Sequence, residues 1–294
     1  MIKEFLSFVP GRRNAVLLLA AMLFFTACKK SVGTAAPATP LPAMNLANVS
    51  YGSAAEQKMD IYLPAGRSGD STKVIFLIHG GSWNGGDKTD FSGYVSTLQS
   101  GLPGYAIVNL NYRLATGNSN LFPAQENDVK SAADFLFGRR ADYHVSSKWV
   151  FLGASAGGQL ALLQSYKYNL PVVPKAVISF FGPTDLPALY ASNPLVGAGL
   201  EAVTGTTPLL NPTLYRQSSP ISFVSPQSPP TLLLQGGKDP IVPPSQSVAL
   251  RDKLSSSQVP VQYVFYPSEG HGWFDENLTD SFTRIFAFLN IYAP

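Results

Sequence analysis

The sequence contains a single cysteine, at position 28, and three histidines among its 294 residues. One cysteine cannot form an intramolecular disulfide, and so few sulfur and imidazole ligands argue against a zinc site. Charged residues are only 13% of the chain, about half the usual share. The formal net charge is +3, without a run of basic residues, which argues against nucleic-acid binding. We therefore expect no metal, no cofactor and no nucleic-acid partner.

Residues 1–27 have the pattern of a secretory signal peptide. Basic residues precede an apolar core, Ala15 to Thr26, that is too short to span a bilayer as a helix. Small residues then lead directly to Cys28. The segment is similar to a bacterial lipoprotein signal, which implies cleavage before Cys28 and a lipid anchor on that residue. The protein would then be exported from the bacterial cytoplasm and held at a membrane, in the periplasm or at the cell surface. A plain secretory signal with an incidental cysteine is the alternative.

Residues 28–45 consist mainly of Ala, Pro, Thr and Ser. Such a segment cannot bury enough apolar surface to offset its ordering entropy, which predicts a flexible tether. We expect the folded domain over residues 46–294, a length that suits one α/β domain.

From residue 59 onward, apolar and β-branched runs alternate with helix-like stretches. This alternation predicts a mainly parallel sheet with helices on both faces. The predicted strands are Met59–Leu63, Lys73–Ile78, Ala106–Leu110, Trp149–Leu152, Ala176–Phe180, Thr231–Leu234 and Val261–Tyr266, and the predicted helices are Ala124–Phe137, Gly157–Tyr166, Ser245–Leu254 and Thr279–Tyr292. Residues 186–230 interrupt this alternation and are rich in Pro, Ser, Asn and Gly. We expect them to form an insertion at the carboxyl ends of the strands, where binding and catalytic sites lie in open parallel sheets.

The sharpest motif is Gly153-Ala154-Ser155-Ala156-Gly157, which lies between a predicted strand and a predicted helix. This is the pattern of a nucleophile elbow, in which Ser155 occupies a strained turn and side chains at both flanking glycines would collide. The N-terminus of the following helix would point at developing negative charge. The alternative is a glycine-rich turn whose serine only caps the helix.

A second glycine loop, His79-Gly80-Gly81-Ser82-Trp83, follows the strand Lys73–Ile78. Acyl transfer needs backbone N–H donors for the oxyanion. We expect Ala156 in the elbow to supply one donor and this loop to supply the others. His79 itself is expected to be a scaffold residue, and a simple glycine turn is the alternative.

An activated serine needs a general base, and imidazole suits neutral pH. In this architecture the base follows the serine and the acid along the chain, so His271 remains once His79 and His144 are set aside. Asp239 follows the strand Thr231–Leu234 and is the favoured acid. Asp185 also follows a strand and is the second candidate, although we expect it to hold its own loop.

These motifs resemble the α/β-hydrolase superfamily, specifically the esterases similar to hormone-sensitive lipase and the bacterial feruloyl-esterase-like enzymes. Further matching stretches are Asn111-Tyr112-Arg113-Leu114, Phe122-Pro123-Ala124, Gly182-Pro183-Thr184-Asp185-Leu186 and Gly270-His271-Gly272, so the resemblance covers residues 50–292. It implies an α/β-hydrolase fold with a twisted, mainly parallel sheet of eight strands and a small cap insertion after the sixth strand.

Residue by residue, the resemblance implies Ser155 as nucleophile, Asp239 as acid and His271 as base, with the amides of Gly81, Ser82 and Ala156 as oxyanion donors. Ser82 stands where many relatives have a third glycine, which crowds the hole.

The expected function is therefore that of a serine hydrolase that cleaves carboxylic esters through an acyl-enzyme. Its substrates would be small-molecule or polysaccharide-linked esters. An amidase, formamidase or peptidase on the same fold is the first alternative. A non-catalytic surface binding module is the second.

Overall fold

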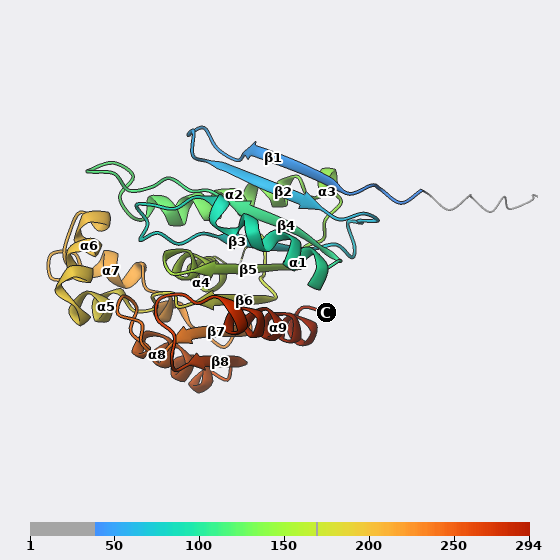
Figure 1. Cartoon of the computed structure of the whole chain (residues 1–294). Coiled ribbons are helices and arrows are strands. Elements are labelled where there is room, and N and C mark those ends of the chain that lie inside the picture. Colours follow the sequence, from blue (N-terminus) through green and yellow to red (C-terminus); the bar gives the residue numbers. More distant parts are fainter. Residues whose placement is uncertain (1–38, 169) are drawn as a thin grey trace, which may run out of the picture. The chain divides into compact units, whose positions relative to one another are not determined.

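The computed structural model describes residues 39–168 and 170–294, so the expected signal segment and Cys28 lie outside the described residues. Its strands form one sheet in the order β1-β2-β4-β3-β5-β6-β7-β8 (Figure 1). The strands are β1 Met44–Ser50, β2 Lys58–Leu63, β3 Lys73–Ile78, β4 Tyr105–Leu110, β5 Trp149–Ala154, β6 Ala176–Phe180, β7 Thr231–Gly236 and β8 Val261–Tyr266. Pairings β1–β2 and β2–β4 are antiparallel and the other five are parallel. The predicted mainly parallel sheet is confirmed.

Helices cover both faces of the sheet, as expected. On one face, α2 (Ala124–Gly138), α4 (Ala156–Lys167) and α8 (Ser245–Ser256) contribute to one hydrophobic cluster. On the other, the 3-10 helix η1 (Lys88–Tyr94), α1 (Val95–Gly101) and α9 (Asp275–Tyr292) pack on a second cluster. A short helix, α3 (Arg140–Tyr143), follows α2.

Strand β3 shows why the central strands are continuous apolar runs. Its side chains point alternately to the two faces, so Val74 and Phe76 join the first cluster while Ile75 and Leu77 join the second. All four are fully buried. A strand covered on both faces needs apolar residues at every position, which is the pattern that the sequence displays.

The insertion between β6 and β7 forms the helices α5 (Leu186–Ser192), α6 (Pro194–Thr204), α7 (Pro212–Gln217) and the 3-10 helix η2 (Pro220–Phe223). Each of the three α-helices begins with an Asp or Asn side chain that accepts a backbone hydrogen bond, followed by proline. Both features favour helix starts. These helices lie beyond the carboxyl ends of the parallel strands (Figure 1).

The last residues of the predicted tether, residues 28–45, belong to the folded domain. Strand β1 starts at Met44, and the carbonyl of Leu41 already accepts a hydrogen bond from Gly66 N–H at 2.8 Å. These residues are held through their backbone groups, which composition does not reveal. Both clusters lie within Pro40–Pro294, which forms a compact unit. Within the described residues, no helix is long and apolar enough to cross a membrane.

A buried charged group attaches α2 to the segment after β4. The carboxylate of Asp128, with its side chain only 1% exposed, accepts the backbone N–H of Arg113 at 2.8 Å and its guanidinium at 2.7 Å. It also accepts Nε2 of Gln57 at 2.7 Å. On the same helix, Asp134 forms an ion pair with Lys130 in which both side chains are exposed.

We predict that Asp128→Ala lowers the free energy of unfolding by about 3–5 kcal/mol, because it leaves buried donors without an acceptor. The matched change Asp134→Ala should cost less than about 1 kcal/mol, since its pair is solvent-exposed. Urea unfolding at neutral pH measures both values. Equal losses for the two variants would contradict the role given to Asp128.

Candidate active site

Ser155 lies at the sharp turn between β5 and α4, with backbone angles φ +54° and ψ −122°. A non-glycine residue rarely adopts this conformation, so the surroundings must enforce it. A Cβ atom on Gly157 would lie 2.0 Å from the carbonyl oxygen of Ile78, and one on Gly153 would lie 2.1 Å from that of Gly157. The requirement for glycine on both sides of the serine is therefore confirmed.

The structure brings together three residues that the sequence places far apart. His271 Nε2 lies 2.9 Å from Ser155 Oγ, and His271 Nδ1 lies 2.8 Å from Asp239 Oδ2. With Nδ1 donating to the carboxylate, Nε2 is free to accept the serine hydroxyl proton. The ring of Phe181 packs against the imidazole with 4.6 Å between ring centroids. Strands β5, β7 and β8 run parallel, so their following loops meet at one edge of the sheet.

The carboxylate of Asp239 is fully buried and held from several sides. Its Oδ1 accepts the backbone N–H groups of Ile241 and Val242, both at 2.9 Å, while the His271 side chain keeps 18% exposure. Gln235 Nε2 also donates to Oδ2 at 3.3 Å. Sequence reasoning missed Gln235, although an amide side chain directly after the apolar run Leu232–Leu234 in β7 was an available signal.

The other acid and histidine candidates lie elsewhere. Asp185 Oδ1 accepts the N–H of Ala188 at 3.1 Å and so caps α5, in agreement with its expected role in its own loop. Among the described residues it makes no hydrogen bond to His271. His144 lies at the end of α3 in a left-handed conformation, before strand β5 begins.

The glycine loop after β3 lies against the serine, since a Cβ atom on Gly80 would be 3.2 Å from Ser155 Cβ. Within the described residues, the N–H groups of Gly81 and Ser82 donate no hydrogen bond to the protein. Ala156 is the first residue of α4, where helix N–H groups lack intrahelical acceptors. The three backbone donors expected at this site are therefore available for a ligand oxygen.

Side chains that sequence reasoning did not identify hold this loop in place. Trp83 Nε1 donates to Gln159 Oε1 at 3.0 Å, and Gln159 Nε2 donates to the carbonyl of Ser218 at 2.8 Å. Gln159 is fully buried in α4. It thus connects the glycine loop, the helix after the serine and the insertion.

His79 lies beneath the loop, in agreement with its expected scaffold role. Its side chain stacks on Tyr112 with 4.2 Å between ring centroids, and Nδ1 pairs with the carbonyl of Gly80 at 2.7 Å. The hydroxyl of Tyr112 donates to the carbonyl of His79 at 2.9 Å. Burial lowers the pKa of His79 below its ordinary value, against weaker raising effects from the carbonyl of Gly80 and from Asp90 and Asp87. Burial therefore favours the neutral form of the imidazole.

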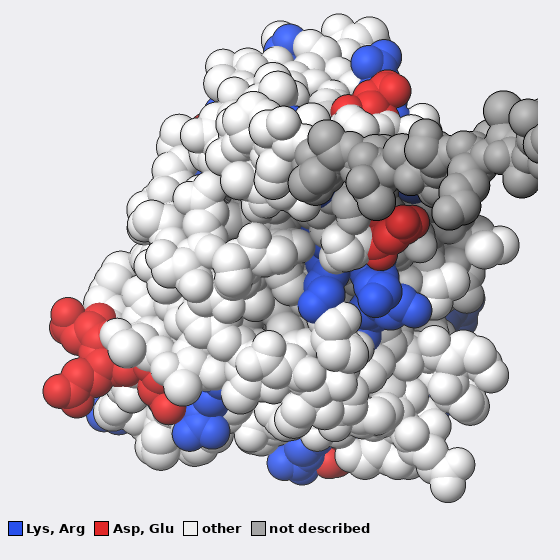
Figure 2. Space-filling view, turned by 90° about the vertical axis from the view of Figure 1, so that its right-hand side faces the viewer, with Lys and Arg blue, Asp and Glu red and all other residues white. Residues whose placement is uncertain are grey.

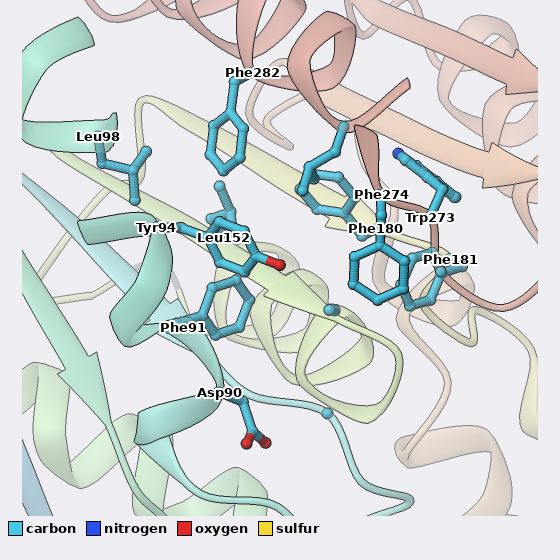
Figure 3. Close-up of a pocket in the computed structure, with 14 residues that line it drawn as sticks. Asp90, Phe91, Tyr94, Leu98, Leu152, Phe180, Phe181, Trp273, Phe274 and Phe282 are labelled. Carbon is cyan, nitrogen blue, oxygen red and sulfur yellow. The ribbon is translucent and has the colours of Figure 1, made fainter. Parts of the chain in front are cut away.

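Two cavities adjoin the serine. One, of about 210 Å³, is lined by Ser155, Trp83 and side chains of the insertion such as Leu189 and Val196. The second, of about 200 Å³, begins at Gly80 and Ala154 and extends between η1 and α9. Figure 3 shows the aromatic rings that surround the second cavity, which include Phe91, Tyr94, Phe180, Phe274 and Phe282.

The site holds no cluster of metal ligands. In the part of the chain that the structure describes, no group of three His, Cys, Asp or Glu side chains could hold a metal ion.

The chain is similar to known proteins. Residues 59–254 match the model of the family described as BD-FAE. The chain is 30% identical over 216 residues to "Probable carboxylic ester hydrolase LipM" of Mycobacterium tuberculosis, covering 68% of this chain and 49% of that protein. It is 28% identical to "Esterase LipQ" of the same organism, covering 79% of this chain and 58% of that protein. The chain thus spans about half the length of these relatives.

Solved structures share the fold. A bifunctional GH43-CE protein of Bacteroides eggerthii matches with a TM-score of 0.71 and 26% identity, over 83% of this chain and 38% of that one. A truncated carbohydrate esterase from gut microbiota matches with a TM-score of 0.69 and 24% identity, over 86% of this chain and 99% of that one.

The lowered pKa of His79 predicts a pH-dependent stability. His79 takes up a proton near pH 6.5 in the unfolded chain, but only at a lower pH in the folded chain. The free energy of unfolding should therefore fall as pH decreases below about 6.5. We expect His79→Gln to flatten this dependence between about pH 7 and pH 5.5, as measured by urea unfolding. An unaltered slope in His79→Gln would contradict the assignment.

Proposed function

The chain belongs to the BD-FAE family and has the α/β-hydrolase fold, and we propose that it is a serine hydrolase that cleaves carboxylic esters through an acyl-enzyme. The observation that carries this proposal is the continuous hydrogen-bonded chain Ser155–His271–Asp239, at 2.9 Å and 2.8 Å, beside unoccupied backbone N–H groups. The esterase names of the relatives support it.

In the first half of the reaction, Ser155 Oγ attacks the ester carbonyl carbon while His271 Nε2 takes the hydroxyl proton. A tetrahedral intermediate forms with negative charge on the former carbonyl oxygen. The buried carboxylate of Asp239 stabilises the imidazolium and keeps Nδ1 as a donor. When the C–O bond breaks, the imidazolium returns the proton to the leaving alcohol, and the acyl group remains on Ser155.

In the second half, water attacks the acyl-enzyme and His271 accepts its proton. The second tetrahedral intermediate collapses when Ser155 leaves as an alkoxide and receives that proton from the imidazolium. Both intermediates carry their charge at the same place. We assign the N–H groups of Gly81, Ser82 and Ala156 to that oxyanion, and each good donor of this kind contributes about 3 kcal/mol to the transition state.

Both halves of an ester need space beside the serine. The two cavities adjoining Ser155 and the glycine loop offer it, each about 200 Å³ in volume. Their walls are mainly apolar, and no Lys or Arg lines either of them, which favours uncharged ester groups over phosphate or carboxylate substrates. We propose small-molecule or polysaccharide-linked carboxylic esters as substrates. The carbohydrate esterase among the structural neighbours supports this class.

We propose further that residues 1–27 are a signal peptide, that a lipid is attached to Cys28, and that the mature protein is held at a membrane, periplasmic or at the cell surface. The support is the sequence pattern before the one cysteine of the chain.

We predict that Ser155→Ala lowers the turnover of p-nitrophenyl acetate by about 10⁴–10⁶-fold and abolishes labelling by a fluorophosphonate probe. Parallel assays with the matching anilide separate an esterase from an amidase. Retained turnover in this variant would refute the assignment of the nucleophile.

The two acid candidates provide a matched pair for the same assay. Asp239→Asn should lower kcat by about 10⁴-fold. The amide carries no negative charge, and with its oxygen on the N–H groups of Ile241 and Val242 it turns an NH2 donor to His271 Nδ1, which favours the wrong tautomer. Asp185→Asn should change kcat by less than about threefold, since asparagine also caps a helix. The larger loss in Asp185→Asn would overturn the proposed triad.

For the anchor, we predict that Cys28→Ser moves the esterase activity from the membrane fraction of the producing bacterium to the soluble fraction. Intact-mass measurement of the membrane-bound wild type should show a chain that begins at residue 28 and carries acyl chains. Ser31→Ala is the control and should stay with the membrane. A wild-type chain found without lipid would exclude the anchor.

A further inference from the structure

A basic hollow lies at the end of the sheet opposite to the site. It has a volume of about 420 Å³, and its basic side chains are Arg67, Lys73 and Lys148. Lys73 begins β3 and Lys148 directly precedes β5, whereas the site residues follow the carboxyl ends of the strands. Figure 2 looks onto this side of the molecule and shows Lys and Arg side chains close together in its middle.

The basic side chains of the basic hollow make no direct ion pair in the described part of the chain. Arg67 is only 8% exposed, and its Nε has no hydrogen-bond partner. Burial, followed by the charge of Lys148, lowers the pKa of Lys73. The lining also includes the exposed Asp70 and Pro294, whose side-chain and α-carboxylates reduce the net positive charge of the basic hollow.

The basic hollow is also where the described chain enters the sheet domain. The carbonyl of Pro42 accepts a hydrogen bond from the Arg67 guanidinium, and that of Leu41 accepts one from Gly66. From Cys28 to Pro40 the chain can reach about 40 Å when fully extended. A compact domain of the length Pro40–Pro294 has a diameter of about 45 Å. A chain anchored at Cys28 is therefore too short to bring the opposite, site-bearing end to the membrane readily.

We propose that the basic hollow docks on anionic phospholipid headgroups, so that the protein rests on its membrane with the site facing away. The orientation rests on the lipid anchor proposed at Cys28, whereas the affinity for anionic lipid depends only on the three basic side chains. Each Lys or Arg held near an anionic membrane surface raises the affinity by roughly fivefold. The ammonium groups of Lys73 and Lys148 supply donors and charge for phosphate oxygens, and the buried guanidinium of Arg67 adds positive charge beneath them.

The test is sedimentation of residues 28–294, with the Cys28 thiol blocked, with vesicles of phosphatidylglycerol or of phosphatidylcholine. At about 0.1 M salt the Debye length is about 10 Å, so remote charges are screened. We expect binding to phosphatidylglycerol vesicles only. The double variant K73Q/K148Q should lower the partition coefficient about 25-fold. Both positions are accessible, and the variant should keep its turnover of p-nitrophenyl acetate, which shows that it is folded.

The control variant K58Q/R216Q removes the same charge at the other end of the sheet. Lys58 begins the antiparallel strand β2, and Arg216 lies in α7 of the insertion. We expect its partition coefficient to stay within about twofold of the wild type.

Three outcomes would overturn the proposal. The first is equal binding to both kinds of vesicle, which would point to the exposed apolar side chains at the site-bearing end, such as Leu195, Leu209 and Phe274. The second is undiminished binding of K73Q/K148Q. The third is complete displacement by millimolar inorganic phosphate at constant ionic strength, which would indicate a site for small anions. Because the thiol is blocked, these outcomes do not depend on whether Cys28 carries a lipid.

Discussion

Close contact between three backbone segments beneath Ser155 is the constraint on which the site depends. Gly153 and Gly157 leave no space for a Cβ atom, because the carbonyl oxygens of Gly157 and Ile78 occupy it. The turn between β5 and α4 is thereby forced into an unfavourable conformation at Ser155. Such strain costs about 1–3 kcal/mol. The hydrophobic clusters on both faces of the sheet offset this cost. They hold the turn in place, so that the serine hydroxyl stays at the carboxyl end of β5.

The acid Asp239 is more deeply buried than the base His271, as the proposed chemistry requires. The Asp239 carboxylate is fully buried, and the His271 side chain is 18% exposed. Backbone N–H groups and Gln235 fix the carboxylate, and the carboxylate fixes the imidazole tautomer. The glycine loop has a similar support in Trp83 and Gln159. The imidazole and the glycine loop are thus each held by a further side chain of the protein.

The carboxyl ends and the amino ends of the parallel strands differ in polarity and charge. At the carboxyl edge lie the site, apolar cavities and exposed apolar side chains of the insertion. At the amino edge lie the basic hollow and the point where the described chain enters the domain. In a parallel sheet the loops at one edge can change without disturbing those at the other. We infer that this separation lets one domain turn its site to the substrate and its charged side to a membrane.

The sequence by itself determined the features that depend on neighbouring residues. The alternation of runs such as Lys73–Ile78 gave the strands, and the motif around Ser155 gave the turn, because periodicity and the steric limits of glycine act locally. Tertiary structure decided the rest. It paired His271 with Asp239 rather than Asp185 and placed Gln235 behind the acid. It also joined residues before Met44 to the domain and gathered Arg67, Lys73 and Lys148 from separate segments of the chain. These contacts depend on strand order and packing, which no local pattern encodes.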